Sequence, residues 1–302
     1  MTARPTLENW LSILFLGLIW GGTFMVVAVA LRGYGPVTVA CARTTLGAVA
    51  LLTLMRALGR SFPKDVATWA YAVPIGLLTT ALPFFLLSWG QQHVPSAFAG
   101  LSMAALPLFV LPLAHFFSDE PMSLRRAAGV TLGFSGAALL LGPGVTALGT
   151  DTASALGQIA CLSAAVSYAV GSILTRRCPP LDAITLTAVT LTVGAAVLIP
   201  AMLLFEGVPR LSSSLSDPAI ILLGLIPTAL AALIRVRVVQ TAGSVFMTLV
   251  NYQVPVWSMV LGAAILGEVL PIRFFAALAL ILTGLAVSQW GALGRLVRGR
   301  AA

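Results

Sequence analysis

Polar side chains and aromatic rings recur near the centres of long apolar segments of this sequence. Polar groups at such depth are unfavourable in a membrane unless they meet partners or a wet cavity. Amide groups can bond both a carboxylate and an ammonium group, and aromatic faces can hold a cation or stack on a ring. We therefore predict a cavity for a zwitterion or an amphipathic organic solute. Its predicted lining residues are Trp20, Thr23, Thr80, Ser102, Met103, Tyr168, Thr228, Asn251, Tyr252 and Gln253.

Each of these residues also has a purely structural interpretation. A threonine in a membrane helix often bonds a carbonyl of its own helix, and Asn251 or Gln253 could join two helices by a hydrogen bond. Arg43 lies about seven residues, or roughly 10 Å, inside its apolar segment. It could attract a carboxylate, but we favour an arginine that snorkels outward or bonds carbonyls at a helix end.

Glu120 and Glu268 lie at the ends of the fourth and ninth apolar segments, respectively. An arginine follows each of them five residues later, as Arg273 follows Glu268. We interpret Glu120 and Glu268 as members of structural capping or gating pairs and not as substrate ligands. Pro107 and Pro255 interrupt the same two segments, and each removes a backbone hydrogen bond and permits a bend that can serve as a hinge.

Patterns for catalysis or metal binding are absent from the centres of the apolar segments. Neither His-x-x-x-His nor Gly-x-Ser-x-Gly nor Glu-x-x-His occurs there, which disfavours a membrane-embedded enzyme. The three cysteines have no partners at metal-ligand spacing. We predict no metal and no cofactor. None of the nine acidic residues falls at the centre of a segment, so a carboxylate proton relay is disfavoured as well.

The elements that position these residues follow from composition. Apolar residues make up 59% of the 302 positions and charged residues 9%, against roughly 25% charged residues in a soluble domain. A bilayer core of about 30 Å needs roughly 20 apolar residues in a helix. Ten runs of that size occur, and they are too long for barrel strands, so we predict an all-α membrane protein. The runs are residues 11–31, 36–56, 68–90, 95–117, 123–142, 155–175, 183–205, 218–240, 243–266 and 272–290.

Ten spans place both termini on one side of the membrane. The basic residues on that side are Arg4, Arg56, Arg60, Lys64, Arg125, Arg126, Arg176, Arg177, Arg295, Arg298 and Arg300. The other side has Arg32, Arg210 and Arg273, so the ratio is eleven to three. Positively charged loops face the cytoplasm, which predicts cytoplasmic termini. The net charge of +8 lies in these short loops and indicates no nucleic-acid partner.

The sequence contains an internal repeat with an offset of 148 residues. Glu268 follows Glu120, and Pro255 follows Pro107, at this spacing; Thr228 and Gln240 repeat Thr80 and Gln92, and Tyr168 repeats the aromatic Trp20. We assign residues 1–147 to a first half and residues 148–302 to a second. Each half holds five spans, and this odd number inverts the second half. Inverted repeats are typical of alternating-access transporters, whose site lies near the midplane between the halves.

Small residues predict how two spans pack. Gly129, Gly133 and Gly136 line one side of the fifth span and would let another helix approach closely. Gly284 repeats Gly136 in the tenth span. We therefore predict that spans five and ten pack on each other, and that the protein functions as a monomer.

These features resemble the drug/metabolite transporter superfamily, in particular its ten-helix EamA-type carriers. The resemblance runs from about residue 10 to residue 290. The residues that carry it are Trp20-Gly21-Gly22-Thr23, Arg43, Pro107 with Glu120, and Pro255 with Gly267-Glu268. The segment Asn251-Tyr252-Gln253-Val254-Pro255-Val256-Trp257 is most similar to the YddG-type amino-acid exporters. That similarity adds Trp257 to the predicted substrate-binding residues.

The resemblance implies a carrier in the cytoplasmic (inner) membrane, with the lipid bilayer and a small-molecule substrate as its partners. We expect it to export amino acids, aromatic or neutral, or related metabolites. A nucleotide-sugar or sugar-phosphate exchanger would need a basic cluster, and only Arg43 lies at useful depth. Three further functions stay open: a drug transporter of the same superfamily, a channel and a membrane-embedded enzyme.

Overall fold

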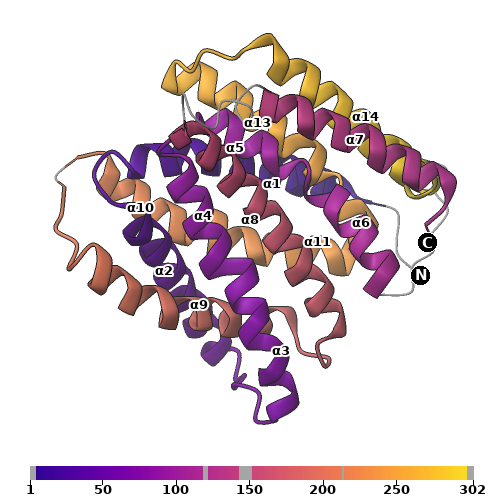
Figure 1. Ribbon diagram of the computed structural model, residues 1–302. Helices are drawn as coiled ribbons and strands as arrows, with labels where there is room; N and C mark the ends of the chain where they lie inside the picture. The colour runs from indigo at the N-terminus through magenta and orange to yellow at the C-terminus, as the bar shows by residue number, and fades with distance from the viewer. Residues whose placement is uncertain (1–4, 118–121, 143–151, 213, 298–302) are drawn as a thin grey trace.

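A computed structural model of the chain describes residues 5–117, 122–142, 152–212 and 214–297. Every regular element in these ranges is a helix, which confirms the predicted all-α class (Figure 1). In chain order the elements are α1 (Leu7–Ala30), α2 (Pro36–Ala57), α3 (Val66–Gly76), η1 (Leu77–Ala81), α4 (Leu82–Gly90), α5 (Ser96–Met103), α6 (Leu106–Phe117), α7 (Leu124–Leu141), α8 (Thr152–Arg177), α9 (Ala183–Phe205), α10 (Ser216–Gly224), η3 (Leu225–Leu230), α11 (Ala231–Ala242), α12 (Ser244–Met247), α13 (Val250–Leu266) and α14 (Ile272–Val297).

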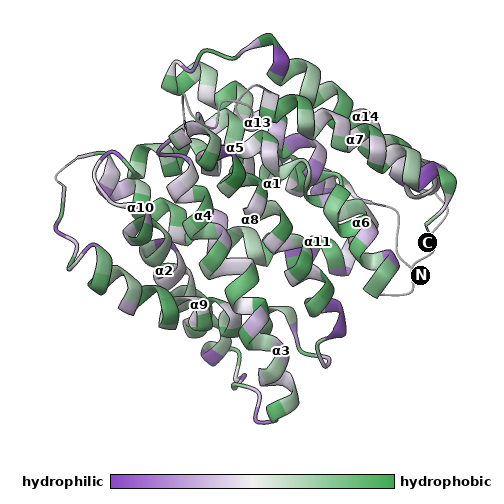
Figure 2. Ribbon diagram, viewed as in Figure 1, coloured by the Kyte–Doolittle hydropathy of each residue, from purple (hydrophilic) through white to green (hydrophobic). Residues whose placement is uncertain are grey.

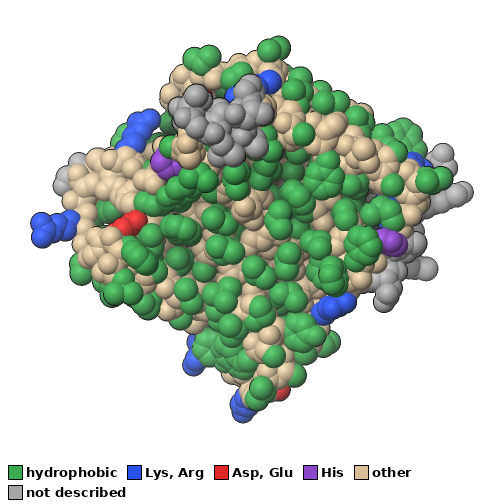
Figure 3. All heavy atoms as spheres, in the orientation of Figure 1, with side chains coloured by type: hydrophobic (Ala, Val, Ile, Leu, Met, Phe, Trp, Pro, Cys, Tyr) green, Lys and Arg blue, Asp and Glu red, His purple; other side chains and the backbone are tan. Residues whose placement is uncertain are grey.

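Eight helical stretches of the described chain are long and apolar enough to cross a membrane. The two other predicted spans are helical too: α7 forms the fifth, and α12 with α13 forms the ninth, which is broken between Met247 and Val250. Hydrophobic residues run along most of the helices (Figure 2) and cover much of the visible surface (Figure 3). Exposed apolar surface of this extent fits contact with lipid.

Side chains at helix ends explain where several helices begin and end. Thr6, Asp65, Ser123 and Asp182 each accept a hydrogen bond from the backbone N–H three residues later. Such caps satisfy N–H groups that have no partner inside the helix. At Gly267, after α13, the backbone is left-handed with φ of 68°, a conformation that favours glycine.

Helices of one half pair chiefly with helices of the other. α1 packs on α13, and in the equivalent arrangement its counterpart α8 packs on α6. The pairs α2 with α9 and α7 with α14 each join a helix to its own counterpart in the repeat. A two-fold relation between the halves produces this set of pairs. The halves therefore interdigitate. Their predicted boundary at residue 147 lies outside the described residues.

The contact between α7 and α14 depends on glycine, as predicted. A Cβ on Gly129 would lie 2.5 Å from the backbone nitrogen of Ser288, and one on Gly284 would lie 2.5 Å from the backbone nitrogen of Gly133. A Cβ on Gly136 would meet Leu280 at 2.8 Å. Only helices without side chains at these positions can approach so closely. The prediction that spans five and ten pack on each other is confirmed.

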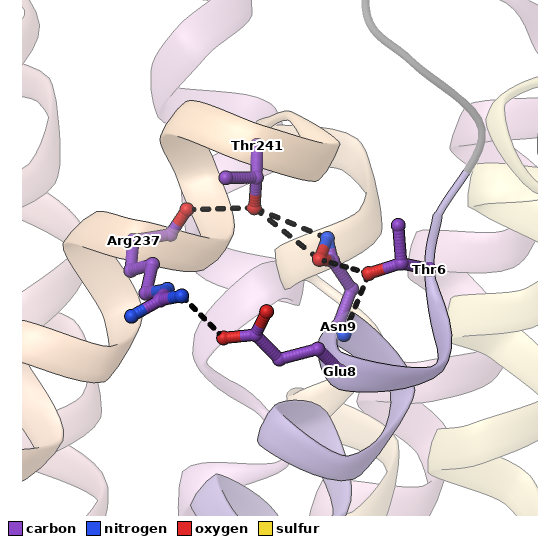
Figure 4. A network of polar contacts seen from close by, with 5 residues as sticks. All are labelled: Thr6, Glu8, Asn9, Arg237 and Thr241. Carbon is purple, nitrogen blue, oxygen red and sulfur yellow. Dashed lines mark hydrogen bonds and ion pairs between the residues drawn. The ribbon is translucent and has the colours of Figure 1, made fainter.

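A polar network joins the start of α1 to the end of α11 (Figure 4). Glu8 forms an ion pair of 2.6 Å with Arg237. Asn9 donates from Nδ2 to the hydroxyl of Thr241 at 3.1 Å, and Thr241 donates to the carbonyl of Arg237 at 2.8 Å. We call this end of the bundle the terminal face.

The end of α14 lies at the terminal face as well, because Thr248, just after α12, donates to Gln289 of α14 at 3.3 Å. Both ends of the described chain therefore reach one face. The opposite end of the bundle, which holds the starts of α2 and α5, is called the distal face. At that end Ser216 of α10 donates to the carbonyl of Val29 at 2.9 Å and so ties α10 to the end of α1.

Candidate functional site

Two π-helical segments lie at matching positions of the two halves. η1 begins at Leu77 and η3 at Leu225, so their starts are 225 − 77 = 148 residues apart. This is the offset of the repeat in the sequence. The wider turn of a π-helix releases carbonyl groups from ordinary helical bonding, and such segments are frequent at functional sites.

A side chain from the opposite half bonds a carbonyl of each π segment. Trp20 of α1 donates from Nε1 to the carbonyl of Pro227 in η3 at 3.1 Å. Ser167 of α8 donates from Oγ to the carbonyl of Leu78 in η1 at 2.8 Å. Trp20 is half-buried, so the structure brings this predicted site residue to the contact between the halves.

The two predicted threonines lie inside the π segments and are both buried. Thr80 donates to the carbonyls of Gly76 at 2.5 Å and Thr190 at 3.3 Å. Thr228 donates to the carbonyl of Leu223 at 2.8 Å and accepts a hydrogen bond from Arg43. Of these two threonines, only Thr228 forms a hydrogen bond with a charged side chain.

Arg43 is buried, with 8% of its surface exposed. Its Nε donates to Thr228 Oγ1 at 3.1 Å, and its Cζ lies 3.8 Å from the ring centre of Phe84, within range of a cation–π interaction. The expectation that Arg43 snorkels outward or bonds carbonyls at a helix end was wrong. The hydroxyl of Thr228 and the ring of Phe84 provide partners inside the bundle that the sequence of α2 does not reveal.

Tyr168 lies next to Arg43. Its ring packs against two hydrophobic cores, one built around α1, α5 and α13 and the other around α2 and α9, and it keeps partial exposure. Tyr168 is also close enough to Arg43 for the two side chains to interact electrostatically. Trp20, Arg43, Phe84, Tyr168 and Thr228 thus form what we call the arginine cluster.

Three predicted lining residues are held by contacts within the protein, although one of them, Thr23, also lines a hollow beside α1 and η3. Ser102 is fully buried and donates to the carbonyl of Ala99 at 2.7 Å, so it does not line a cavity in this structure. Thr23 is buried and bonds the carbonyl of Ile19 in its own helix at 2.9 Å. Met103 packs against the core around α5. For Thr23 and Ser102 the helix backbone is the nearest acceptor.

The predicted residues of α13 lie on different sides of that helix. Gln253 and Trp257 face α1, since a Cβ on Gly17 or Gly21 would come within 2.8 Å and 2.4 Å of them respectively. They therefore fill the contact between α1 and α13. Tyr252 Oη and Gln253 Oε1 are buried without a hydrogen bond among the described residues.

Asn251, the second residue of α13, is half-buried, and no hydrogen bond of its side chain occurs within the described ranges. A hollow of about 200 Å³ lies beside α1 and η3, with an apolar lining that includes Thr23, Ile226 and Pro227. This hollow does not include Asn251 or the arginine cluster.

The two prolines of spans four and nine have different local settings. Pro107 is the second residue of α6, just after the break that follows α5, whereas Pro255 lies inside α13. The helix breaks also differ, since span nine breaks before Val250 and not at Pro255. Glu120, which follows Pro107 at the end of span four, lies outside the described residues.

Glu268 caps the start of α5 at the distal face. Its carboxylate accepts hydrogen bonds from the backbone N–H groups of Ser96 at 2.7 Å and Ala97 at 3.0 Å. A capping role was predicted, but the partner is different: no ion pair joins Glu268 to Arg273 in the described part of the chain. The partner is a helix start from the other half, which a local pattern cannot identify.

Glu206 forms a second cap that the sequence interpretation missed. Its carboxylate accepts from the backbone N–H groups of Val37 at 2.9 Å and Thr38 at 2.8 Å, at the start of α2. A Cβ on Gly35 would lie 2.3 Å from that carboxylate, so glycine makes the contact possible. One sequence signal could have suggested such a cap. The residue before α2 is Gly35, which has no side chain to bond the free N–H groups at the helix start, so these groups need a partner from elsewhere.

Arg235 is a further functional candidate, which the sequence patterns do not single out. It lies on the side of α11 that also carries Ala231, Val238 and Ala242, all of which are buried. Arg235 itself is exposed. An exposed cation on the side of α11 that otherwise carries buried residues is unusual in a membrane-spanning helix.

At the distal face, Tyr34 and Asp217 tie the loop after α1 to the start of α10. The Tyr34 hydroxyl donates to the Asp217 carboxylate, and this hydrogen bond raises the pKa of Tyr34 above its usual value. Asp217 also accepts from the backbone N–H of Ser212 at 3.0 Å. These contacts hold the distal ends of α1 and α10 together.

Comparisons with known proteins agree with this architecture. The model of the EamA-like transporter family matches residues 9–142 and again residues 155–289. A probable terminal-alkyne amino-acid exporter of Streptantibioticus cattleyicolor is 28% identical over 294 residues, which cover 95% of this chain and 94% of the relative. The uncharacterized inner membrane transporter YedA of Escherichia coli is 27% identical and covers 93% of this chain and 90% of the relative.

A solved crystal structure has the same fold. It superposes with a TM-score of 0.68 at 21% identity and covers 97% of this chain and 99% of the other. Since the family model matches nearly the whole length in two copies, the chain belongs to the EamA-like transporter family and is a multi-pass membrane transporter.

Proposed function

We propose that this transporter exports neutral amino acids, aromatic ones among them, or related small metabolites across the cytoplasmic membrane by alternating access. The observation that carries the proposal is the arginine cluster, to which both halves contribute: Trp20, Arg43 and Phe84 come from the first, and Tyr168 and Thr228 from the second. A cation, a hydroxyl and aromatic rings together suit a solute with a carboxylate and an apolar side chain. The relative named as an amino-acid exporter supports the same class of solute.

The orientation of the carrier in the membrane is proposed from the charge of the two faces. Arg60, Lys64, Arg176 and Arg237 belong to the terminal side, which we therefore assign to the cytoplasm. In this arrangement the exposed Arg235 lies on the cytoplasmic side of the arginine cluster, where a solute would enter.

The distal face would be the exit. Glu206 and Glu268 each tie a helix start there by two charge-assisted hydrogen bonds. These caps join α2 to the end of α9 and α5 to the loop before α14. We infer that release to the outside requires both caps to break, and that their reformation returns the carrier to the cytoplasm-facing state.

The proposal is tested with purified protein in liposomes loaded with unlabelled solute, by counterflow of individual radiolabelled amino acids. We expect saturable uptake of phenylalanine, leucine or another neutral amino acid, and none in liposomes without protein. Competition by nucleotide sugars but not by amino acids would favour a nucleotide-sugar exchanger. Uptake that never saturates would indicate a channel, and failure of every amino acid would refute the proposed substrate class.

A further inference from the structure

Arg43 is a buried cation in the membrane-spanning part of the bundle. It is the eighth residue of α2 and is 8% exposed. An arginine does not lose its proton in proteins, so its charge must be balanced in another way. A buried charge without a counter-ion is strongly unfavourable, because it has lost its water without gaining a partner.

No carboxylate among the described residues balances this charge. Every described acidic residue is engaged at a helix end or in a loop. Their partners are Arg237 for Glu8, Thr68 for Asp65, Arg60 and Thr185 for Asp182, Val37 and Thr38 for Glu206, Tyr34 and Ser212 for Asp217, and Ser96 and Ala97 for Glu268. The ionisable neighbour of Arg43 is instead the phenol of Tyr168.

The geometry fixes the guanidinium but leaves its two terminal nitrogens without hydrogen bonds to the described residues. Nε is bonded to Thr228 Oγ1 at 3.1 Å, and Cζ lies 3.8 Å from the centre of the Phe84 ring. Together these contacts set the plane of the group. Within the described ranges, no hydrogen bond reaches the two terminal nitrogens Nη1 and Nη2. Those nitrogens form the fork that binds a carboxylate through two parallel hydrogen bonds.

We propose that Arg43 binds the carboxylate of the transported solute, and that the site requires this carboxylate and does not require the ammonium group. This inference rests on the proposed function and makes it more specific. The solute carboxylate supplies the missing counter-charge. The ammonium group meets no carboxylate of the described chain, whereas the rings of Trp20 and Tyr168 accept the apolar side chain of the solute.

The position of Arg235 fits the same assignment. Arg235 and Thr228 are seven residues apart in span eight, which is about two helical turns or roughly 10 Å along the axis. A carboxylate that enters past the exposed Arg235 would therefore travel about two turns along span eight to reach Arg43.

The test measures binding to the full-length wild-type protein in detergent by thermal stabilisation. The four probes share one ring: L-phenylalanine, 3-phenylpropanoate, L-phenylalaninamide and 2-phenylethylamine. We expect both carboxylates to stabilise the protein and both amines to need at least a tenfold higher concentration. Equal potency of L-phenylalaninamide, or no stabilisation by either carboxylate, would overturn the inference. Counterflow of other amino acids would then still decide the proposed function separately.

Variants locate the effect at Arg43. In Arg43→Gln, the preference for 3-phenylpropanoate over 2-phenylethylamine should disappear, and Arg43→Lys should restore part of it. Arg56→Gln is the matched control, since Arg56 is an exposed arginine of the same helix, and it should keep the full preference. If Arg43 only held helices together, Arg43→Gln would weaken all probes equally and leave the preference unchanged. Should Arg43→Gln not fold, the wild-type comparison of the four probes decides.

Discussion

The π segments η1 and η3 share a backbone shape, a position in the repeat and a central threonine, yet their surroundings differ. Around η1, Thr80 bonds two backbone carbonyls and Ser167 bonds another. Around η3, Thr228 accepts from the charged Arg43 and Trp20 bonds the carbonyl of Pro227. The repeat therefore determines a common framework for both halves, while a charged side chain lies beside one segment only.

The residue equivalent to Arg43 in the second half shows this asymmetry most directly. Addition of the offset gives 43 + 148 = 191, and Leu191 is buried in the core around α2 and α9. A Leu191→Arg change would place an uncompensated charge beside η1, where Thr80 already donates to carbonyls. We expect a loss of about 3–5 kcal/mol in stability, seen as a much lower melting temperature in detergent.

Leu191→Met is the control for that change, because a swap of similar volume should cost less than about 1.5 kcal/mol. A stable Leu191→Arg protein that still transports would show that the two π segments are chemically interchangeable.

Thr228 and Thr80 differ in their partners, and substitution of each tests whether this difference matters for transport. Thr228→Val leaves Arg43 Nε without its acceptor, and an unsatisfied buried donor costs about 1–3 kcal/mol. We expect counterflow of the best amino acid to fall by about tenfold, which corresponds to roughly 1.4 kcal/mol.

Thr80→Val removes only bonds to backbone carbonyls that already belong to helices, so its transport should remain within about a factor of two of the wild type. Similar losses in Thr80→Val and Thr228→Val would mean that the threonines serve the π backbone and not Arg43.

The carbonyl partners of the π segments give a smaller effect. Trp20→Phe and Ser167→Ala each remove one hydrogen bond to a π carbonyl, worth about 1 kcal/mol. We expect similar shifts in melting temperature, but a several-fold loss of transport only in Trp20→Phe. Equal transport in the two variants would place the solute away from η3.

We expect the smallest change in stability from the cap positions of α3 and α10, the helices that precede η1 and η3. Asp65 caps the start of α3 through its side chain, whereas Leu215, the residue before α10, provides no side-chain cap. Hydrogen bonds from Thr68 hold the pKa of Asp65 below its usual value of 3.8. The stabilising contribution of Asp65 is therefore present above pH 3.8 and is lost as the pH falls through the lower folded value.

Asp65→Ala should accordingly lower the melting temperature slightly at pH 6 and not at all in strong acid. An equal difference at both pH values would show that ionised Asp65 is not what stabilises the start of α3.

Several features of this protein follow from its sequence alone. The lengths of the apolar runs predicted the ten helical segments, because the thickness of the bilayer core sets how many apolar residues a span needs. The 148-residue offset predicted pairs that the structure brings to equivalent places, including Thr80 with Thr228. Glycine spacing predicted the contact between α7 and α14, since only a helix side without side chains permits so close an approach.

Other features were decided by tertiary structure. The burial of Arg43 depends on the hydroxyl of Thr228 and the ring of Phe84, which lie far away in the sequence. Glu268 and Glu206 cap helix starts that local spacing does not connect to them. The physical reason is that hydrophobicity sets the depth of a residue along its helix. The rotation of that helix and the identity of the facing partner arise only when the helices pack.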